Sequence, residues 1–304
     1  MRYRFIDEHK GAYPVGLLCR VMRVSRSAYY AYRGGKSYVL STAKTDLAAQ
    51  VEAIFYRHRR RYGARRVRAE LNAQGTRVGR FAVRSLMRRL GLQAISARRF
   101  RPQTTDSRHA HTPAPNLLLD VRDAPRAPRE VMVGDITYLP LLSGAWAYLA
   151  TWQDRFTRRI VGWAVAERMT DELVTSAFAK AVAAGALRRG TIVHTDRGSQ
   201  YVSAEFRGML ARHGCRQSMS RRGNCYDNAQ AESFFSRFKA ELLEGGCFAD
   251  LVQARGETFT YIEGYYNRER RHSALGYRTP DEFEREFYIT QEGVSSERIV
   301  SCLT

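Results

Sequence analysis

The 304-residue chain has the composition of a globular protein and a net charge of +20, from 50 lysines and arginines against 30 aspartates and glutamates. It contains no run of about 18 apolar residues, which excludes a membrane-spanning helix, and no apolar stretch of the kind a secretory signal needs follows its first residues. The five cysteines are scattered and odd in number, which argues against a disulfide framework. We expect a cytoplasmic protein of two or three domains.

The positive charge is concentrated in the first third of the chain. Residues 1–110 hold 25 lysines and arginines against six acids, a net charge of +19, and the remainder has a net charge of +1. Only five of the 50 basic residues are lysines. A GC-rich genome would explain the preference for arginine but not the unequal distribution. Because the arginine fork matches phosphate oxygens, we expect the N-terminal third to bind nucleic acid.

Residues 1–40 are predicted to contain a small helix-turn-helix. An apolar helical face precedes a turn at 23–25, a second helix starts near Ser25 or Ser27, and Gly34 and Gly35 end it. Two short helices joined by such a turn are typical of a DNA major-groove reader, and a plain helical hairpin is the alternative.

Residues 41–97 are predicted to form a second, basic helical domain. Apolar residues recur at helical spacing in three segments, and Gly75 and Gly91 end the second and third of these. The residues between them are mostly arginines. A charge run is usually just a solvated face, but one of nearly uniform sign repels itself, and a phosphate backbone is its natural counter-charge. The candidate DNA contacts here are Arg65, Arg66, Arg84 and Arg88.

Residues 98–128 are predicted to be an extended linker, because five of the eight prolines fall between residues 98 and 130. From residue 129 to 290 the pattern changes to three strands (about 131–139, 147–152 and 159–165), then helix, strand, helix, strand and helix, with the last helix at about 228–243. This order predicts an α/β domain whose first three strands are antiparallel. Residues 291–304 are expected to be a C-terminal tail.

Three acids stand out in this domain. Asp135 interrupts an apolar strand, where an uncompensated charge is costly, and Asp196 follows another strand, at the kind of edge where α/β sheets bind ligands. Glu232 lies on a predicted helix, with Lys239 two turns further along the same face. If the carboxylates converge, their hard oxygens suit Mg²⁺, and two such ions could activate phosphodiester cleavage. Three acids among 30 are weak evidence by themselves.

Several motifs, taken together, are more specific. They are Asp135-Ile136-Thr137-Tyr138, the run from His194 to Tyr201, the run from Ser218 to Phe235, with 35 residues between Asp196 and Glu232, and a C-terminal motif formed by Tyr265-Tyr266-Asn267 and the run from Arg270 to Pro280. The chain thereby resembles the second-reading-frame transposases of the insertion-sequence-three family, over nearly its whole length.

The resemblance implies an RNase H-like integrase core in which Asp135, Asp196 and Glu232 are catalytic residues that bind Mg²⁺, with Mn²⁺ as an alternative ion. It implies double-stranded DNA as the substrate, namely terminal inverted repeats and target DNA, and a copy-out, paste-in route. The full transposase of this family is often a frameshift fusion to an upstream helix-turn-helix protein, so we expect this chain to be its catalytic part. Pairing of two DNA ends suggests a homo-oligomer.

Further residues are candidates for DNA contact. Arg197 and Gln200 lie in the polar loop beside Asp196, and Lys239 shares the helix face of Glu232. Asn228 is equally well explained as a helix cap, and Arg270 and Arg271 as an exposed basic turn. Two other functions stay open. The chain could be a DNA-binding regulator derived from a transposase but without activity, or an RNase H-like nuclease that does not join strands.

Overall fold

Short amphipathic helices form the N-terminal part of the chain, as predicted. The computed structural model describes residues 2–35, 42–96, 113–119, 124–221 and 229–301, and the chain divides into two compact units, Met1–Gln93 and Ala94–Thr304. Helices α1 (Arg2–His9), α2 (Val15–Val21) and α3 (Arg26–Arg33) pack around Ile6, Leu18, Cys19 and Tyr29. The predicted helix-turn-helix corresponds to α2 and α3, and α1 was not predicted.

The turn of this helix-turn-helix follows from its residues. The Ser25 hydroxyl caps α3 by accepting a hydrogen bond from the backbone N–H of Ala28 at 3.1 Å. Arg23 has a φ of 51°, the left-handed conformation that reverses the chain after α2.

Three further helices, α4 (Thr42–Arg57), α5 (Ala64–Ala73) and α6 (Arg80–Arg89), correspond to the second predicted helical segment. Their buried faces include Val51, Phe55, Val67, Leu71 and Val83, at the helical spacing seen in the sequence. Gly75 and Gly91, at φ of 88° and 65°, follow α5 and α6 in a conformation that glycine adopts without a Cβ penalty.

The second unit is built on a five-stranded mixed sheet with strand order β3-β2-β1-β4-β5. Strands β1 (Val131–Pro140), β2 (Trp146–Asp154) and β3 (Ile160–Ala166) are antiparallel, as predicted. Strands β4 (Ile192–Thr195) and β5 (Arg216–Met219) extend the sheet from β1 in parallel. The central strand β1 therefore has an antiparallel neighbour on one side and a parallel neighbour on the other.

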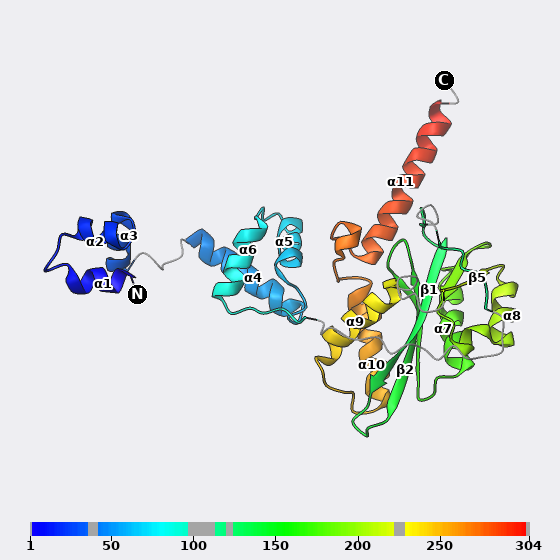
Figure 1. Ribbon diagram of the computed structural model, residues 1–304. Coiled ribbons are helices and arrows are strands. Elements are labelled where there is room, and N and C mark those ends of the chain that lie inside the picture. The colour runs from blue at the N-terminus through cyan, green and yellow to red at the C-terminus, as the bar shows by residue number, and fades with distance from the viewer. Residues whose placement is uncertain (1, 36–41, 97–112, 120–123, 222–228, 302–304) are drawn as a thin grey trace. The chain divides into compact units, whose positions relative to one another are not determined.

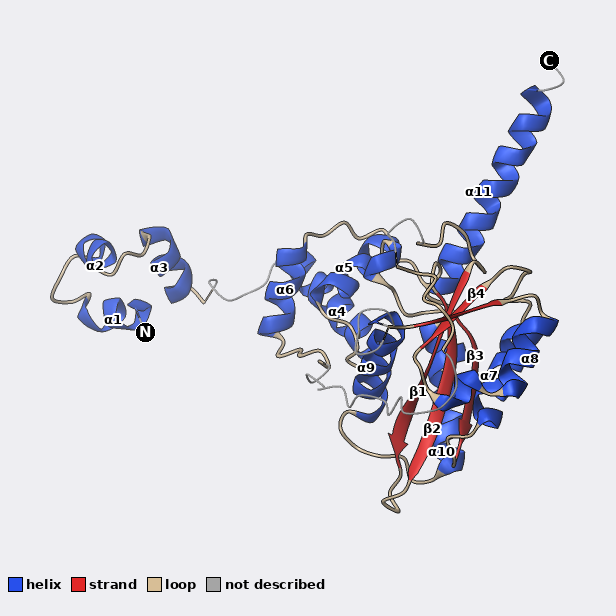
Figure 2. Cartoon of the chain, turned by 45° about the vertical axis from the view of Figure 1, so that its right-hand side comes forward, coloured by secondary structure: helices blue, strands red, loops and turns tan. Residues whose placement is uncertain are grey.

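Helices cover both faces of this sheet (Figure 1). Helices α7 (Asp171–Ala183) and α8 (Ala204–Arg212) lie on one face. Helices α9 (Ala229–Leu243) and α10 (Leu251–Phe259) lie on the other, as the second view confirms for α9 (Figure 2). The predicted α/β class is confirmed. Within the described residues no helix is long and apolar enough to cross a lipid bilayer.

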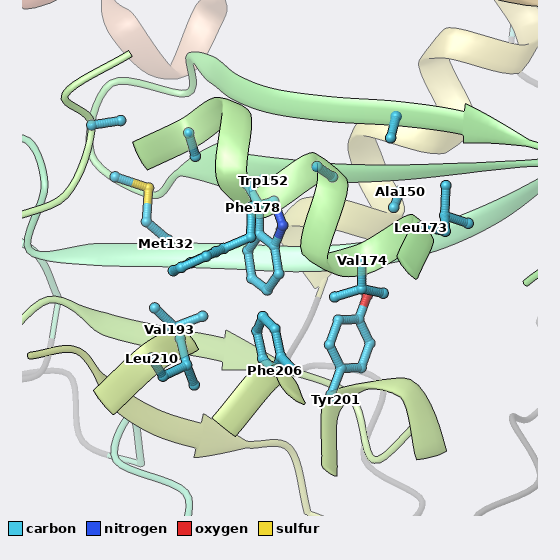
Figure 3. Close-up of a cluster of buried hydrophobic side chains, with 14 of the residues drawn as sticks. Met132, Ala150, Trp152, Leu173, Val174, Phe178, Val193, Tyr201, Phe206 and Leu210 are labelled. Carbon is cyan, nitrogen blue, oxygen red and sulfur yellow. The ribbon is translucent and has the colours of Figure 1, made fainter. Parts of the chain in front are cut away.

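The face under α7 and α8 holds an extensive apolar core, with aromatic rings at its centre (Figure 3). The Trp152 ring stacks on Phe206 and meets Phe178 edge to face, with ring centroids 5.6 and 5.3 Å apart. Two glycines make room for this packing. A Cβ on Gly134 would lie 2.2 Å from the Trp152 ring, and one on Gly162 would lie 2.3 Å from the Ala177 carbonyl oxygen of α7.

The C-terminal part differs from the prediction. Helix α10 continues into a π-helix at Thr260–Tyr266, a short 3₁₀ turn follows at Ser273–Leu275, and helix α11 spans Pro280–Ser301. The boundary expected near residue 290 thus falls inside a helix. The first turns of α11 are held by contacts of Phe283 and Phe287 with Phe156 of the β2–β3 turn, which no local sequence pattern reveals.

Replacing Gly162 should test the close packing of α7 on the sheet. We expect Gly162→Ala to destabilise the second unit by about 1–3 kcal/mol, because the new methyl group overlaps α7 backbone atoms. Calorimetry should then give a Tm lower by about 2–12 °C. The control is Gly256→Ala on α10, where a Cβ meets no atom within 4 Å and helix propensity favours alanine. An unchanged Tm for Gly162→Ala would contradict this packing.

Candidate active site

The register of β1 with β4 brings the two predicted aspartates together. The parallel pairs are Val131 with Ile192 and Val133 with His194. The same offset, continued two residues along each strand, sets Asp135 beside Asp196, and neighbouring strands lie about 4.8 Å apart. Asp135 is in mid-strand, whereas Asp196 directly follows the last residue of β4. Two residues 61 positions apart in sequence therefore lie side by side near the centre of the sheet.

Local hydrogen bonds orient both carboxylates. The backbone N–H of Ile136 donates to Asp135 Oδ1 at 2.8 Å, and that of Gly198 donates to Asp196 Oδ1 at 3.0 Å. A Cβ at position 198 would lie 2.9 Å from Gln200 Oε1 and 3.1 Å from Asp196 Oδ1, so any side chain there would displace the ends of these two side chains. The loop after β4 is therefore folded tightly around the Asp196 carboxylate.

A buried histidine holds this loop against the neighbouring strand. The ring nitrogens of His194, which has no exposed surface, lie 2.8 Å from Ser218 Oγ and 3.1 Å from Ser220 Oγ. Arg197 Nε donates to the Ser220 carbonyl oxygen at 2.8 Å. These contacts join β4 to the end of β5 on both sides of Asp196. His194 and the two serines thus support the site, a role that no spacing in the sequence indicated.

Helix α9 brings Glu232 and Lys239 to the same site. Burial, the Asp196 carboxylate and the Glu232 carboxylate all raise the pKa of Asp135, whereas the Ile136 N–H and Lys239 oppose this shift. Partial burial raises the pKa of Glu232. Burial lowers the pKa of Lys239, and the attraction of Asp135 works in the opposite direction. Asp196, Glu232 and Lys239 are therefore each close enough to Asp135 to act on it electrostatically.

The donor chemistry of the site fits a divalent cation. Asp196 and Glu232 both raise the pKa of Asp135, so the site has an excess of negative charge, and Lys239 supplies only one positive charge. Hard oxygen donors of this kind are the ligands that Mg²⁺ prefers. Among the residues that the structure describes, however, no three histidine, cysteine, aspartate or glutamate side chains lie close enough to hold an ion as they stand. The carboxylates are neighbours but do not form a closed coordination shell.

The predicted DNA contacts fall into different environments. Arg65, Arg84 and Arg88 are exposed on α5 and α6, and the Arg66 guanidinium lies 5.7 Å from the centre of the Tyr62 ring. In the second unit, Gln200 Nε2 donates to the Met169 carbonyl at 3.3 Å, and Arg271 donates to the Tyr277 carbonyl at 3.0 Å. Asn228 lies outside the described residues.

The prediction that Arg270 contacts DNA is wrong in this structure. Arg270 is 2% exposed, and its guanidinium donates to both oxygens of Glu241 at 2.9 and 2.6 Å. The Tyr261 hydroxyl also donates to Glu241, at 2.9 Å. The basic motif Arg270-Arg271 suggested a phosphate grip because the sequence does not reveal that a glutamate 29 residues away is the partner of Arg270.

Comparison with known proteins agrees with this architecture. An HTH-like domain matches residues 43–100, and integrase core domains match residues 125–225 and 213–280. The transposase InsF for insertion sequence IS3A of Escherichia coli (strain K12) is 39% identical over 287 residues, which is 93% of this chain and 98% of the relative. The transposase for insertion sequence element IS904 of Lactococcus lactis subsp. lactis (strain IL1403) is 40% identical over 79% of this chain and 93% of the relative.

Among solved structures, the HTLV-2 integrase catalytic core domain in complex with magnesium is 17% identical. The match covers 52% of this chain and 98% of that chain, with a TM-score of 0.41. That TM-score is too low to support an argument, so the comparison rests on the sequence relatives.

The buried pair of Arg270 and Glu241 should be structural. We expect Arg270→Met to destabilise the second unit by about 3–5 kcal/mol, because it leaves the Glu241 carboxylate buried without its ionic partner. Calorimetry should record a Tm lower by about 6–20 °C. Arg268→Met, at an exposed position two residues away, is the matched control and should leave the Tm unchanged. Weaker DNA binding by Arg270→Met at an unchanged Tm would instead support a DNA contact.

Proposed function

The chain belongs to the insertion-sequence-three (IS3) family of transposases, and from that premise we propose that it cuts and joins DNA strands at the ends of such an element with divalent metal ions held by Asp135, Asp196 and Glu232. The observation that carries the proposal is the β1–β4 register that sets Asp135 beside Asp196, with Glu232 near enough to raise the pKa of Asp135. Negative charges placed this close together repel one another and lower stability. A bound cation removes that cost, so the arrangement favours a metal-dependent function.

The reaction consists of two phosphodiester exchanges. In the first, water attacks a phosphorus at the element end, the bond to the 3′ oxygen breaks, and a 3′-hydroxyl and a 5′-phosphate result. In the second, that 3′-hydroxyl attacks another strand, so a new ester bond forms as an old one breaks and another 3′-hydroxyl is released. We place both exchanges at the terminal inverted repeats, in a copy-out, paste-in route in the bacterial cytoplasm.

The chain's own residues have separate tasks in this scheme. Asp135 and Asp196 would hold ions from neighbouring strands, and Glu232 would reach them from α9. A bound Mg²⁺ would activate the attacking oxygen and stabilise the leaving one, and Mn²⁺ is the alternative ion. Lys239, drawn toward Asp135, offers its ammonium group to the phosphate on which negative charge gathers. The described carboxylates do not form a closed shell, so Glu232 would be the ligand that completes it when an ion binds.

DNA binding is divided between the two units in this proposal. The exposed arginines of α5 and α6 bind the phosphates of the inverted repeat, and residues near Asp196 and Lys239 contact the reacting strand. Two element ends must be held at once, which a homo-oligomer achieves. The fused upstream helix-turn-helix protein of the family would add a further DNA-binding module.

Single substitutions of the carboxylates should separate binding from chemistry. We expect Asp135→Asn, Asp196→Asn and Glu232→Gln each to abolish cleavage and joining, because each removes a negatively charged ligand, while binding to labelled inverted-repeat ends stays unchanged. The assay supplies Mg²⁺, labelled inverted-repeat ends, target DNA and, if needed, the fused upstream partner. Cleavage without joining by the unaltered chain would favour the nuclease, and binding with no chemistry at all would favour the inactive regulator.

The basic face of α6 should control the salt dependence of end binding. Log affinity falls with log salt, and each phosphate contact adds about 0.9 to the steepness of that fall. We therefore expect Arg84→Gln combined with Arg88→Gln to make the fall shallower by about 2. Fluorescence anisotropy at several salt concentrations measures this slope. The control is Arg212→Gln on α8, an exposed arginine on the sheet face away from α9. An unaltered slope in the double variant would place the phosphate contacts elsewhere.

A further inference from the structure

Helix α9 is bonded to the rest of its unit near both ends. Near its start, Gln230 Nε2 donates to Gln153 Oε1 at 3.0 Å and to the Asp154 carbonyl oxygen at 3.4 Å. Near its end, Glu241 accepts from Arg270 and Tyr261. Glu232 lies two residues after the first of these contacts and nine residues before the second. Together the contacts restrict both rotation of the helix and sliding along its axis.

The surroundings of Gln153 fix the orientation of its side-chain amide. It is 2% exposed, and its amide nitrogen donates to the Arg158 carbonyl oxygen at 2.8 Å and to the Tyr266 hydroxyl at 2.9 Å. Since a carbonyl oxygen accepts but never donates, the contact with Arg158 sets which way the Gln153 amide faces. Its Oε1 must therefore face α9, where it requires a hydrogen-bond donor. The Gln230 amide supplies that donor.

The sheet register connects this contact to the candidate active site. Gln153 pairs with Val133 across the β1–β2 ladder, and Asp135 pairs with Thr151. Gln153 and Asp135 are thus on the same face of the sheet, about 7 Å apart along the strand direction at 3.3 Å per residue. The hydrogen bond from Gln230 ties the first turn of α9 to the strand pair that carries Asp135.

The C-terminal motif reinforces the same helix. Tyr266 binds Gln153 through its hydroxyl, and its ring meets the Phe234 ring of α9 edge to face at 4.9 Å. The Arg270 guanidinium lies 5.7 Å from the centre of the Tyr266 ring. One tyrosine therefore touches both the anchor at the start of α9 and the ion pair at its end.

We propose that Gln230, acting through Gln153, is a positioning residue for the strand-cutting reaction, which sets the height and rotation of the first turn of α9 and so the distance from Glu232 to Asp135. The inference rests on the proposed function, because it assigns Gln230 to the geometry of that site. Gln230 does not itself hold an ion. Loss of its donor would leave Gln153 Oε1 buried without a partner and release the turn that carries Glu232.

Gln230→Met is the decisive variant, because methionine has nearly the same length but cannot donate a hydrogen bond. We expect the single-turnover cleavage rate to fall about 10- to 100-fold, the range found when a partner supporting a metal ligand is lost. The affinity for inverted-repeat ends should be unchanged. The Tm should fall by about 2–12 °C, since the variant loses both hydrogen bonds of the Gln230 amide and leaves the buried Gln153 Oε1 without a donor. Gln253→Met, at an exposed position where the side chain binds the Ala249 N–H, is the matched control.

A second measurement needs no catalysis. Mn²⁺ should raise the Tm of the unaltered chain and of the Gln253→Met control, and the concentration for half of this effect should be about 10-fold higher or more for Gln230→Met. Equal Mn²⁺ responses and equal cleavage rates in Gln230→Met and the unaltered chain would overturn the inference. A Mn²⁺ difference without any cleavage by the unaltered chain would instead count against the proposed reaction while supporting the positioning role.

A double-mutant cycle checks that the two glutamines act together. If they work through one hydrogen bond, Gln153→Met and Gln230→Met combined should slow cleavage no more than the stronger single variant does. Rate effects that multiply would overturn the inference. Should Gln153→Met fail to fold, Gln230→Leu replaces the cycle: it offers no donor and adds no charge, so its rate should fall as far as that of Gln230→Met. A rate near that of the unaltered chain would contradict the role of the donor.

Discussion

The repulsion between carboxylates placed side by side at the centre of a sheet is the constraint that the rest of the catalytic unit accommodates. Parallel pairing of β1 with β4 sets Asp135 beside the residue that follows β4, Asp196, and α9 adds a third acid. The raised pKa of Asp135 records the cost of this arrangement. A fold can maintain it only if the strands and the helix cannot move apart, so rigidity is needed on both faces of the sheet.

The two faces supply this rigidity by different means. Under α7 and α8 the packing is apolar, and aromatic rings around Trp152 fill the space so closely that Gly134 and Gly162 must lack side chains. Under α9 the aromatic contacts of Phe234 and Phe238 are joined by polar, directional ones, namely a buried ion pair and the two glutamines. Apolar packing stabilises without fixing orientation, whereas hydrogen bonds specify it. The face that carries Glu232 is the one whose orientation matters for the proposed metal site.

The sequence predicted much of this unit because its strands and helices carry strong local signals. The apolar run around Asp135, the strand before Asp196 and the helix of Glu232 were each found near their actual bounds. Helices α1, α10 and α11 were missed. The first turns of α11 are held by distant contacts, such as Phe283 with Phe156, and a short amphipathic segment such as α1 has a weak periodicity. The DNA contact predicted for Arg270 failed for the same reason, because its partner Glu241 is distant in sequence.

By itself the sequence determined the identity of the three acids, their spacing, the concentration of arginine in the first third and the family to which these motifs belong. Those properties are local or compositional, so they can be seen without coordinates. Only the tertiary structure decided that β1 and β4 pair in the register that brings Asp135 to Asp196, that Arg270 is buried, and that Gln230 meets Gln153. Each of these depends on residues far apart along the chain, whose meeting is set by packing of the whole domain and not by any local pattern.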